Sequence, residues 1–173
     1  MIRVPHPDVP DIRISCAVIT VSDTRSVATD RSGQLLKQLL IDSGHHVEVY
    51  AIVKDEPMQI REQLQKLVQR SDLEVLLFNG GTGIAPRDTT FDAIAALLDK
   101  ELPGFGELFR FLSYQEVGSR AIASRALAGV CGNKLVFSVP GSANAVKLAA
   151  EKLILPELVH LTQQLAQPHS AVS

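Results

Sequence analysis

Short apolar runs bounded by glycine, proline and polar residues constrain the fold of this chain more than any other feature of its sequence. Residues 14–21 form one such run, rich in valine and isoleucine, and residues 73–78 form another. Runs of this kind are typical of strands covered on both faces, which occur in parallel sheets with helices on each side. Residues 46–53 alternate between apolar and polar instead, and this pattern predicts a strand nearer the edge of the sheet.

Helix signals separate the predicted strands. Asp30 or Thr29 can cap a helix that ends at Gly44, and Pro57 opens the next one. A further helix is predicted by apolar residues with the i, i+3, i+4, i+7 spacing of an amphipathic face. These residues are Phe105, Leu108, Phe109 and Leu112.

The C-terminal third of the chain completes the predicted architecture. Residues 126–131 and 134–139 flank Gly132-Asn133 and predict a β-hairpin with a type II′ turn. Ser142 can then cap a long helix that bends at Pro156. Because strands alternate with helices, we expect an α/β fold. Its architecture should be a three-layer α/β/α sandwich, with a mainly parallel sheet and one antiparallel edge strand from the hairpin.

Length and composition are those of one folded domain. The chain has 173 residues, of which 46% are hydrophobic and 21% are charged, so disorder and fibrous repeats are excluded. We expect an extended N-terminal arm over residues 1–13, a single α/β domain over residues 14–165 and a C-terminal tail over residues 166–173. The formal net charge of −2 is far from the basic footprint of a nucleic-acid-binding protein.

Cysteine and histidine positions indicate neither a disulfide nor a protein-built metal site. Cys16 and Cys131 lie in runs predicted as strands, where two reduced thiols are expected. The five histidines lack the pair spacing of a zinc site. No apolar run reaches the ~18 residues that span a bilayer, and three prolines near the N-terminus argue against a signal peptide. The protein is therefore predicted to be cytoplasmic and not membrane-bound.

The unusual polar residues of the chain collect where the predicted strands end. Ser22 and Asp23 follow the first strand, and Asp55 follows the second. Gly80-Gly81-Thr82-Gly83 follows the third strand, and Pro140-Gly141-Ser142 follows the last one. In open α/β sheets, ligands bind beyond the carboxyl ends of the strands. We therefore expect the functional site at this edge of the sheet.

The glycine loop Gly80-Gly81-Thr82-Gly83 can be interpreted in two ways. Glycines allow a sharp turn, and they let backbone N–H groups approach an anion without a Cβ in the way. The segment lacks the lysine of a Walker A loop, and Pro86 stands where a dinucleotide-binding loop has its third glycine. A phosphate cradle and a plain tight turn are both open.

Two aspartates beside these loops also have two interpretations each. Asp88 follows the glycine loop and could hold magnesium beside a bound triphosphate, as could Asp55. Each could also be a helix N-cap. Ser142 lies on a strand-to-helix turn like a hydrolase nucleophile, but the residues around it lack the G-x-S-x-G elbow. We expect Ser142 to cap a helix or to contact an anion instead.

The motifs of this chain, taken in order, resemble those of the MogA/MoaB proteins of molybdenum cofactor biosynthesis, and those of MoaB more than those of MogA. The resemblance spans residues 14–160. Its motifs are Thr20-Val21-Ser22-Asp23, Gly80-Gly81-Thr82-Gly83, Pro86-Arg87-Asp88-Thr89, Pro103-Gly104-Phe105, Ser124-Arg125-Ala126 and Pro140-Gly141-Ser142.

The resemblance implies a molybdopterin-binding fold that assembles as a homotrimer or a hexamer. It also implies that molybdopterin is the substrate and that its phosphate receives AMP from Mg-ATP, with release of pyrophosphate. The activated product would then pass to the molybdate-insertion protein in a transient contact. A non-catalytic carrier or scaffold for molybdopterin is the alternative. The Arg87-Asp88 pair, which some MoaB proteins lack, favours the enzyme.

The family's functional residues correspond to matching positions in this chain. Asp55 and Asp88 correspond to the two aspartates needed for adenylyl transfer, and they are expected to hold Mg²⁺ through ATP. Thr82 and Ser113 correspond to hydroxyls of the pterin site. The rim of the pocket corresponds to Ser22, Asp23, Gly80, Gly81, Gly83, Pro140, Gly141 and Ser142.

Overall fold

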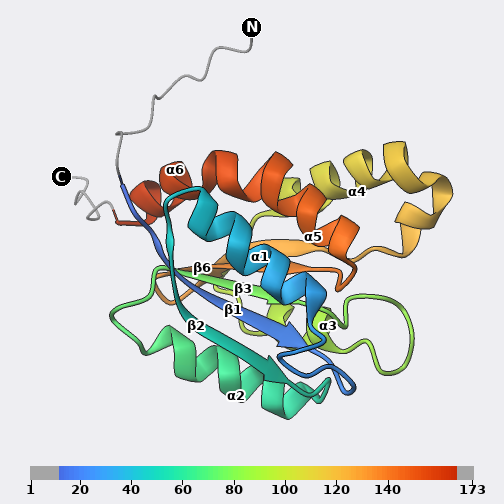
Figure 1. The fold of residues 1–173 in the computed structure, drawn as a ribbon, viewed down its shortest axis with the longest axis horizontal. Coiled ribbons are helices and arrows are strands. Elements are labelled where there is room, and N and C mark those ends of the chain that lie inside the picture. Colours follow the sequence, from blue (N-terminus) through green and yellow to red (C-terminus); the bar gives the residue numbers. More distant parts are fainter. Residues whose placement is uncertain (1–11, 167–173) are drawn as a thin grey trace, which may run out of the picture.

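A central sheet with helices on both faces makes up the fold in a computed structural model, which describes residues 12–166 (Figure 1). Nearly all of the predicted arm (1–13) and tail (166–173) lies outside the described residues. Along the chain the elements are β1 (Ser15–Val21), α1 (Arg31–Asp42), β2 (His46–Val53), α2 (Pro57–Val68), β3 (Val75–Asn79), α3 (Thr90–Ala95), β4 (Lys100–Glu101), α4 (Pro103–Val117), the 3₁₀ helix η1 (Gly118–Ala123), β5 (Leu127–Cys131), β6 (Lys134–Val139), α5 (Ala143–Ala149), the π-helix η2 (Ala150–Ile154) and α6 (Leu155–Ala166).

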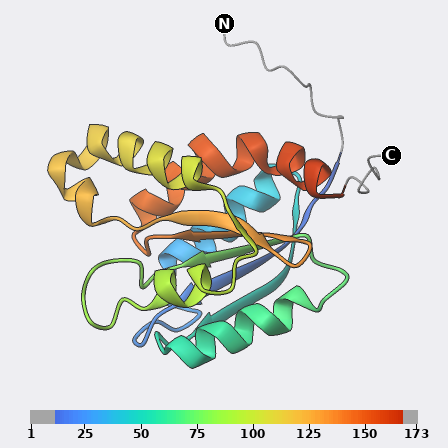
Figure 2. The same ribbon diagram turned by 180° about the vertical axis from the view of Figure 1, so that it is seen from behind.

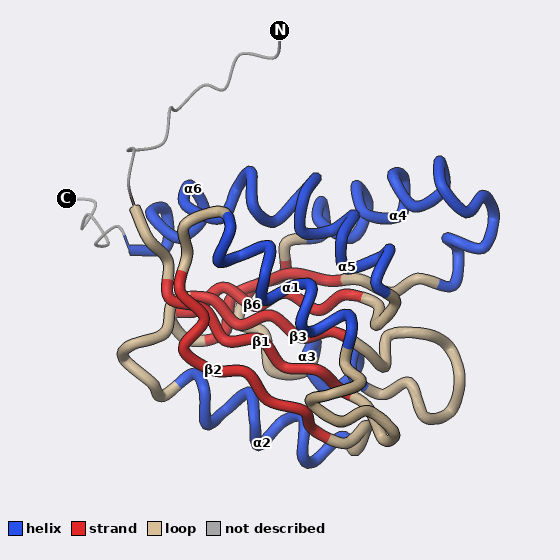
Figure 3. Tube along the Cα trace, in the orientation of Figure 1, coloured by secondary structure: helices blue, strands red, loops and turns tan. Residues whose placement is uncertain are grey.

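The strand order is β2-β1-β3-β6-β5-β4. β1 pairs in parallel with β2 and β3, and β3 pairs in parallel with β6. β5 runs antiparallel to β6, to which the predicted hairpin joins it. The α/β/α sandwich with a mainly parallel sheet and an antiparallel edge is thus confirmed, and β2 lies at the opposite edge, as its alternating sequence predicted. Figure 3 shows the sheet enclosed between helices.

The short strand β4 was not predicted from the sequence. It pairs antiparallel with β5 through Lys100 and Glu101. Gly129 of β5 permits this close approach, because a Cβ there would lie 2.4 Å from the carbonyl oxygen of Lys100. Two residues are too few to show an alternating pattern, so the sequence carried no signal for this strand.

Each face of the sheet has its own hydrophobic core. Cys16 and Val18 of β1 pack toward α1, α4, α5 and α6, whereas Ala17 and Ile19 pack toward α2 and α3. Figures 1 and 2 show these two helical layers on opposite sides of the sheet. Because successive side chains of a strand point to opposite faces, this two-sided burial explains why residues 14–21 are almost wholly apolar.

The amphipathic face predicted for α4 is only partly correct. Phe109 is buried, but Leu108 is 54% exposed. Phe105 and Leu112 are partly buried and pack against the same core, so three of the four predicted residues lie on the inner face. Gly106 and Ser113 are buried on this side as well. Gly106 lets the helix rest on the start of β5, since a Cβ there would lie 2.7 Å from the carbonyl oxygen of Ala126.

The long C-terminal helix changes its geometry before Pro156, where the sequence predicted a bend. The π-helix Ala150–Ile154 separates α5 from α6. A proline ring clashes with the carbonyl four residues earlier, which here belongs to Lys152. The wider π turn contains that residue, so the interruption lies where the proline would strain a regular α-helix.

Cys16 and Cys131 are free thiols, as predicted. Burial raises the pKa of the Cys16 thiol to about 12, with a further increase from the charge of Glu74. Within residues 12–166, no helix has the length and apolar character needed to cross a membrane.

The outer surface of α4 and η1 predicts self-association. Five large apolar side chains there are more than half exposed, namely Leu108, Phe111, Tyr114, Val117 and Ile122. Because contiguous apolar surface of this kind is commonly buried by closed assemblies, we expect light scattering to give three or six times the chain mass of 18.7 kDa. Phe111→Ser should shift the protein toward the monomer. A wild-type monomer at micromolar concentration would contradict this prediction.

Candidate functional site

The loops after β1, β2 and β3 meet at the carboxyl edge of the sheet, as predicted (Figure 1). The strand order brings them together, because β1 lies between β2 and β3. Ser22 donates its backbone N–H to the carbonyl of Val53, and Gly80 donates its N–H to that of Val139. The residues of this edge form two neighbouring regions. One is an acidic centre, which consists of the carboxylates of Asp55 and Asp88 beside the glycine loop, and the other is a pocket.

The glycine loop packs directly against oxygen atoms of the protein. Gly80 has φ of +113° and Gly81 has φ of +57°. A Cβ at Gly80 would lie 2.2 Å from the carbonyl oxygen of Val21, and one at Gly81 would lie 2.3 Å from both Asp55 Oδ2 and Thr90 Oγ1. Protein packing alone therefore requires glycine at both positions. The proposed role of the loop as a phosphate cradle stays a prediction.

Asp55 is buried against the glycine loop and does not cap a helix. Its Oδ1 accepts hydrogen bonds from Thr89 Oγ1 at 2.8 Å and from Thr89 N at 3.3 Å. The N-cap of α2 is Glu56, whose side chain makes no capping hydrogen bond. The capping interpretation of Asp55 is thus wrong, because its carboxylate is turned toward the loop that begins after β3.

Asp88 also lies against the glycine loop. Its Oδ2 accepts a hydrogen bond of 2.9 Å from Ala85 N, and a Cβ on Gly83 would lie 2.5 Å from that oxygen. The N-cap of α3 is Thr89, so the capping interpretation of Asp88 is wrong as well. Asp55 and Asp88 thus contact the same loop, one at Gly81 and the other at Gly83.

Arg87 joins the acidic centre to the loops after β1 and β2. Its Nη2 lies 2.6 Å from Asp23 Oδ2, and its Nη1 lies 2.8 Å from Glu56 Oε1. The hydrogen bond from Arg87 holds the pKa of Asp23 below its usual value. The other oxygen of Asp23, Oδ1, accepts the N–H of Asp55 at 3.2 Å. Since the Arg87 contacts are exposed, they orient the loops more than they stabilise the fold.

The acidic centre fits a magnesium ion that arrives with a phosphate-bearing ligand. Magnesium is commonly held by one or two carboxylates together with substrate phosphates, and Asp55 and Asp88 supply two. Thr90 is fully buried, and its Oγ1 has no hydrogen-bond partner among the described residues. Within residues 12–166, no group of three or more His, Cys, Asp or Glu side chains could hold a metal unaided.

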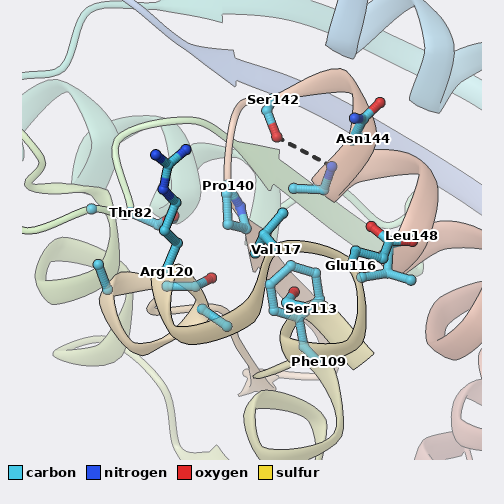
Figure 4. Close-up of a pocket in the computed structure, with 15 residues that line it drawn as sticks. Thr82, Phe109, Ser113, Glu116, Val117, Arg120, Pro140, Ser142, Asn144 and Leu148 are labelled. Carbon is cyan, nitrogen blue, oxygen red and sulfur yellow. Dashed lines mark hydrogen bonds between the residues drawn. The ribbon is translucent and has the colours of Figure 1, made fainter. Parts of the chain in front are cut away.

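A pocket of about 270 Å³ lies between the glycine loop, the α4–η1 segment and the start of α5 (Figure 4). Ser142 Oγ accepts the N–H of Ala145 at 3.2 Å and caps α5, as predicted. Five residues predicted for the site line the pocket, namely Thr82, Gly83, Ser113, Pro140 and Ser142. Thr82 and Ser113, the two residues predicted to give hydroxyls to a pterin site, are both largely buried and line this same cavity.

Sequence reasoning missed four polar residues that line this pocket. Glu116, Arg120, Ser124 and Asn144 lie around it. Ser124 Oγ is buried and has no hydrogen-bond partner among the described residues. Glu116 lies in α4 and Arg120 lies in η1, which follows it. No motif distinguishes these two charges in the sequence, and they share a cavity only where this segment meets the glycine loop and α5. The Ser124-Arg125-Ala126 motif contributed to the MogA/MoaB resemblance, but the resemblance assigned no role to its residues.

The remaining predicted site residues do not line the pocket. Ser22 Oγ accepts the backbone N–H groups of Thr24 and Arg25 and so shapes the turn after β1. Gly141 supports the loop before α5, where its carbonyl accepts Arg25 Nη2 at 2.9 Å. A Cβ on Gly141 would lie 3.0 Å from the Cα of Gly80. The two loops therefore approach each other through their backbones.

A buried polar network lies behind these loops. Asp30 caps α1 through Gly33 N, and it accepts hydrogen bonds from Thr20 Oγ1 at 2.5 Å and from Tyr50 OH at 2.6 Å. Burial alone would raise the pKa of Asp30, but these hydrogen bonds outweigh it and lower the pKa. Arg25 Nη1 adds a contact of 3.4 Å. Through Arg25, the network reaches the carbonyl of Gly141.

Two glycines with positive φ separate the cost of backbone strain from the cost of packing. Gly44 has φ of +87° and open space around a Cβ, whereas Gly81 is enclosed. Alanine in a left-handed conformation costs about 1–2 kcal/mol, so Gly44→Ala should lose that much unfolding free energy. Gly81→Ala should lose a further ~1–3 kcal/mol from overpacking against Asp55 and Thr90. Urea denaturation of both variants measures the difference, and equal losses would show that Gly81 is not confined.

Comparison with known proteins identifies the family. Residues 17–160 match the family described as a probable molybdopterin binding domain. Molybdenum cofactor biosynthesis protein B of Bacillus cereus is 53% identical over 153 residues, which cover 88% of this chain and 90% of that protein. A crystal structure of a molybdenum cofactor biosynthesis protein B has 53% identity and a TM-score of 0.87, over 89% of this chain and 96% of the other. A crystal structure of the tungsten cofactor synthesizing protein MoaB of Pyrococcus furiosus has 38% identity and a TM-score of 0.80, over 92% of this chain and 100% of the other. The predicted resemblance is thus confirmed, and the chain belongs to the molybdopterin-binding domain family of molybdenum cofactor biosynthesis proteins.

Proposed function

We propose that this protein transfers AMP from Mg-ATP to the terminal phosphate of molybdopterin and releases pyrophosphate. The arrangement that supports this most directly is the glycine loop, which has the two carboxylates and the pocket as its neighbours. Asp55 and Asp88 contact the loop at Gly81 and Gly83, while Thr82 and Gly83 line the pocket. One loop thus contacts both the proposed nucleotide site and the proposed pterin site.

The pocket supplies groups suited to the pterin and its phosphate. Thr82 and Ser113 offer hydroxyls, and the ring of Phe109 forms an apolar wall (Figure 4). Arg120, which also lines the pocket, is suited to a phosphate because the guanidinium fork matches phosphate oxygens. Ser124 Oγ needs a partner, and a polar ligand in the pocket would provide one. Molybdopterin, which bears both a polar ring system and a phosphate, satisfies these groups together.

The acidic centre is suited to the triphosphate. Magnesium, when bound with ATP, neutralises phosphate charge and orients the phosphate oxygens. Asp55 is held for this task, because Thr89 donates two hydrogen bonds to one of its oxygens. Asp88 is held by Ala85 N. Fixed carboxylates of this kind lower the cost of ordering the site when the nucleotide binds.

Adenylyl transfer needs no nucleophile from the protein. An oxygen of the molybdopterin phosphate attacks the α-phosphorus of ATP, a new P–O bond forms, and the bond to the β-phosphate oxygen breaks as pyrophosphate leaves. The protein brings two anions into line and offsets their repulsion. Ser142 caps α5, which agrees with a mechanism that forms no intermediate on the enzyme.

Exchange of each carboxylate for an amide tests the proposal. Asp55→Asn and Asp88→Asn keep an oxygen that can accept the hydrogen bonds from Thr89 or Ala85, but they lose the negative charge that holds Mg²⁺. We expect kcat for adenylylated molybdopterin to fall by about 100-fold or more, while the Kd for molybdopterin changes by less than about threefold. Product is measured with Mg-ATP, and Kd is measured by titration without nucleotide.

The exposed carboxylate of Asp42 on α1 provides a matched control, because Asp42→Asn removes the same charge away from the site. This variant should keep wild-type kcat. Full activity in Asp88→Asn, or molybdopterin binding without any product in the wild type, would favour the alternative of a non-catalytic carrier. The transient contact with the molybdate-insertion protein and the cytoplasmic location stay predictions.

A further inference from the structure

Arg125 holds both ends of the loop that carries Asp88. Its Nε donates to the carbonyl of Gly83 at 3.1 Å, and its Nη2 donates to the carbonyl of Asp88 at 3.1 Å. Gly83 and Asp88 lie at the two ends of a segment whose intervening residues are exposed. Arg125 itself lies between η1 and β5, so it fastens this loop to a different part of the chain.

The guanidinium of Arg125 is itself fixed by two neighbours that both lie in α3. Nη1 and Nη2 each lie 3.0 Å from an oxygen of Asp92, in a bidentate pair. The guanidinium carbon also lies 4.8 Å from the centre of the Phe91 ring. A guanidinium is planar and has five N–H donors in a fixed geometry. It can therefore bind a carboxylate and two carbonyls at once, which a lysine ammonium on its flexible stem cannot reproduce.

The internal bonds of the loop do not anchor it to the sheet. Asp88 N donates to the carbonyl of Ala85, and Ala85 N donates to the Asp88 carboxylate. These bonds make residues 85–88 a closed turn. Arg87 links the turn to Asp23 and Glu56, but its side chain is 58% exposed, against 29% for Arg125. Of the two arginines that anchor the loop, Arg125 is thus the one better shielded from solvent.

We propose that Arg125 is a positioning residue for AMP transfer, which sets the place of the Asp88 carboxylate through the carbonyls of Gly83 and Asp88. This inference rests on the proposed function. The adjacent Ser124 lines the pocket, so one short segment borders the pterin site and fixes the acidic centre. Small errors in the placement of reacting groups have large effects on rate. Arg125 should therefore act on kcat more than on ligand affinity.

The test compares Arg125→Lys with Arg70→Lys, a matched control at an exposed bidentate arginine–carboxylate pair with Asp72, beyond the end of α2. Lysine at 125 keeps the positive charge but cannot hold both carbonyls, whereas lysine at 70 loses a similar ion pair away from the loop. For Arg125→Lys we expect kcat to fall at least about tenfold and the Kd for molybdopterin to change by less than about threefold. Arg70→Lys should stay within about threefold of wild type in both.

Amide hydrogen exchange of the ligand-free protein gives a readout that does not depend on activity. The amides of Ala85 and Asp88, which close the turn, should exchange about tenfold faster in Arg125→Lys, since two hydrogen bonds that pin the loop are lost. Arg70→Lys should leave their exchange near the wild-type rate. Thermal unfolding of the three proteins shows whether the folded fraction is equal under the assay conditions.

The proposal would be overturned by wild-type kcat in Arg125→Lys, by unchanged exchange at Ala85 and Asp88, or by an equal loss of kcat in Arg70→Lys. A fall of kcat that matches a fall in the folded fraction would likewise show a purely structural role. Absence of adenylylation in the wild type would instead overturn the proposed function, and the exchange rates would still decide whether Arg125 fixes the loop.

Discussion

Alternate side chains of β1 enter two separate cores, so the strand has no face left for polar chemistry. Cys16 and Val18 pack on one side, and Ala17 and Ile19 pack on the other. Burial of this kind stabilises the sheet in proportion to the apolar area removed from water. It also leaves only the strand ends for functional side chains. The two layers of helices thus determine that a site built on this sheet must lie in the loops beyond its carboxyl edge.

Polar groups at that edge are buried too, and each needs a partner. The carboxylate of Asp30 would be costly without the hydrogen bonds from Thr20, Tyr50 and Gly33. Asn79, at the end of β3, donates to Thr20 Oγ1 and accepts from Ser32 Oγ. The network therefore connects the ends of two neighbouring strands to α1. Through Arg25, it also fixes the loop that brings Ser142 to the pocket.

The parts of the fold that local patterns determine were predictable, and those set by distant contacts were not. Apolar runs identified β1 and β3, but the burial of Gly106 against the carbonyl of Ala126 is a contact that no periodicity reveals. The candidate site follows the same division. Turn chemistry indicated the loops, whereas the partner of Asp55 lies 34 residues away, at Thr89. A carboxylate before a helix looks like an N-cap in sequence, because capping is a local interaction.

In the proposed reaction, the glycine loop would lie between the two anionic ligands. Gly81 contacts Asp55, and Gly83 contacts Asp88 and borders the pocket. Two residues of chain span at most about 7 Å, so the acidic centre and the pocket share one short segment of backbone. A site this compact brings like charges together, and their repulsion grows as water is excluded. The main requirement of such a site is accurate placement of opposing charge. Arg87 and Arg125 meet this requirement, because they hold the loop between Gly83 and Asp88, whose intervening side chains are exposed.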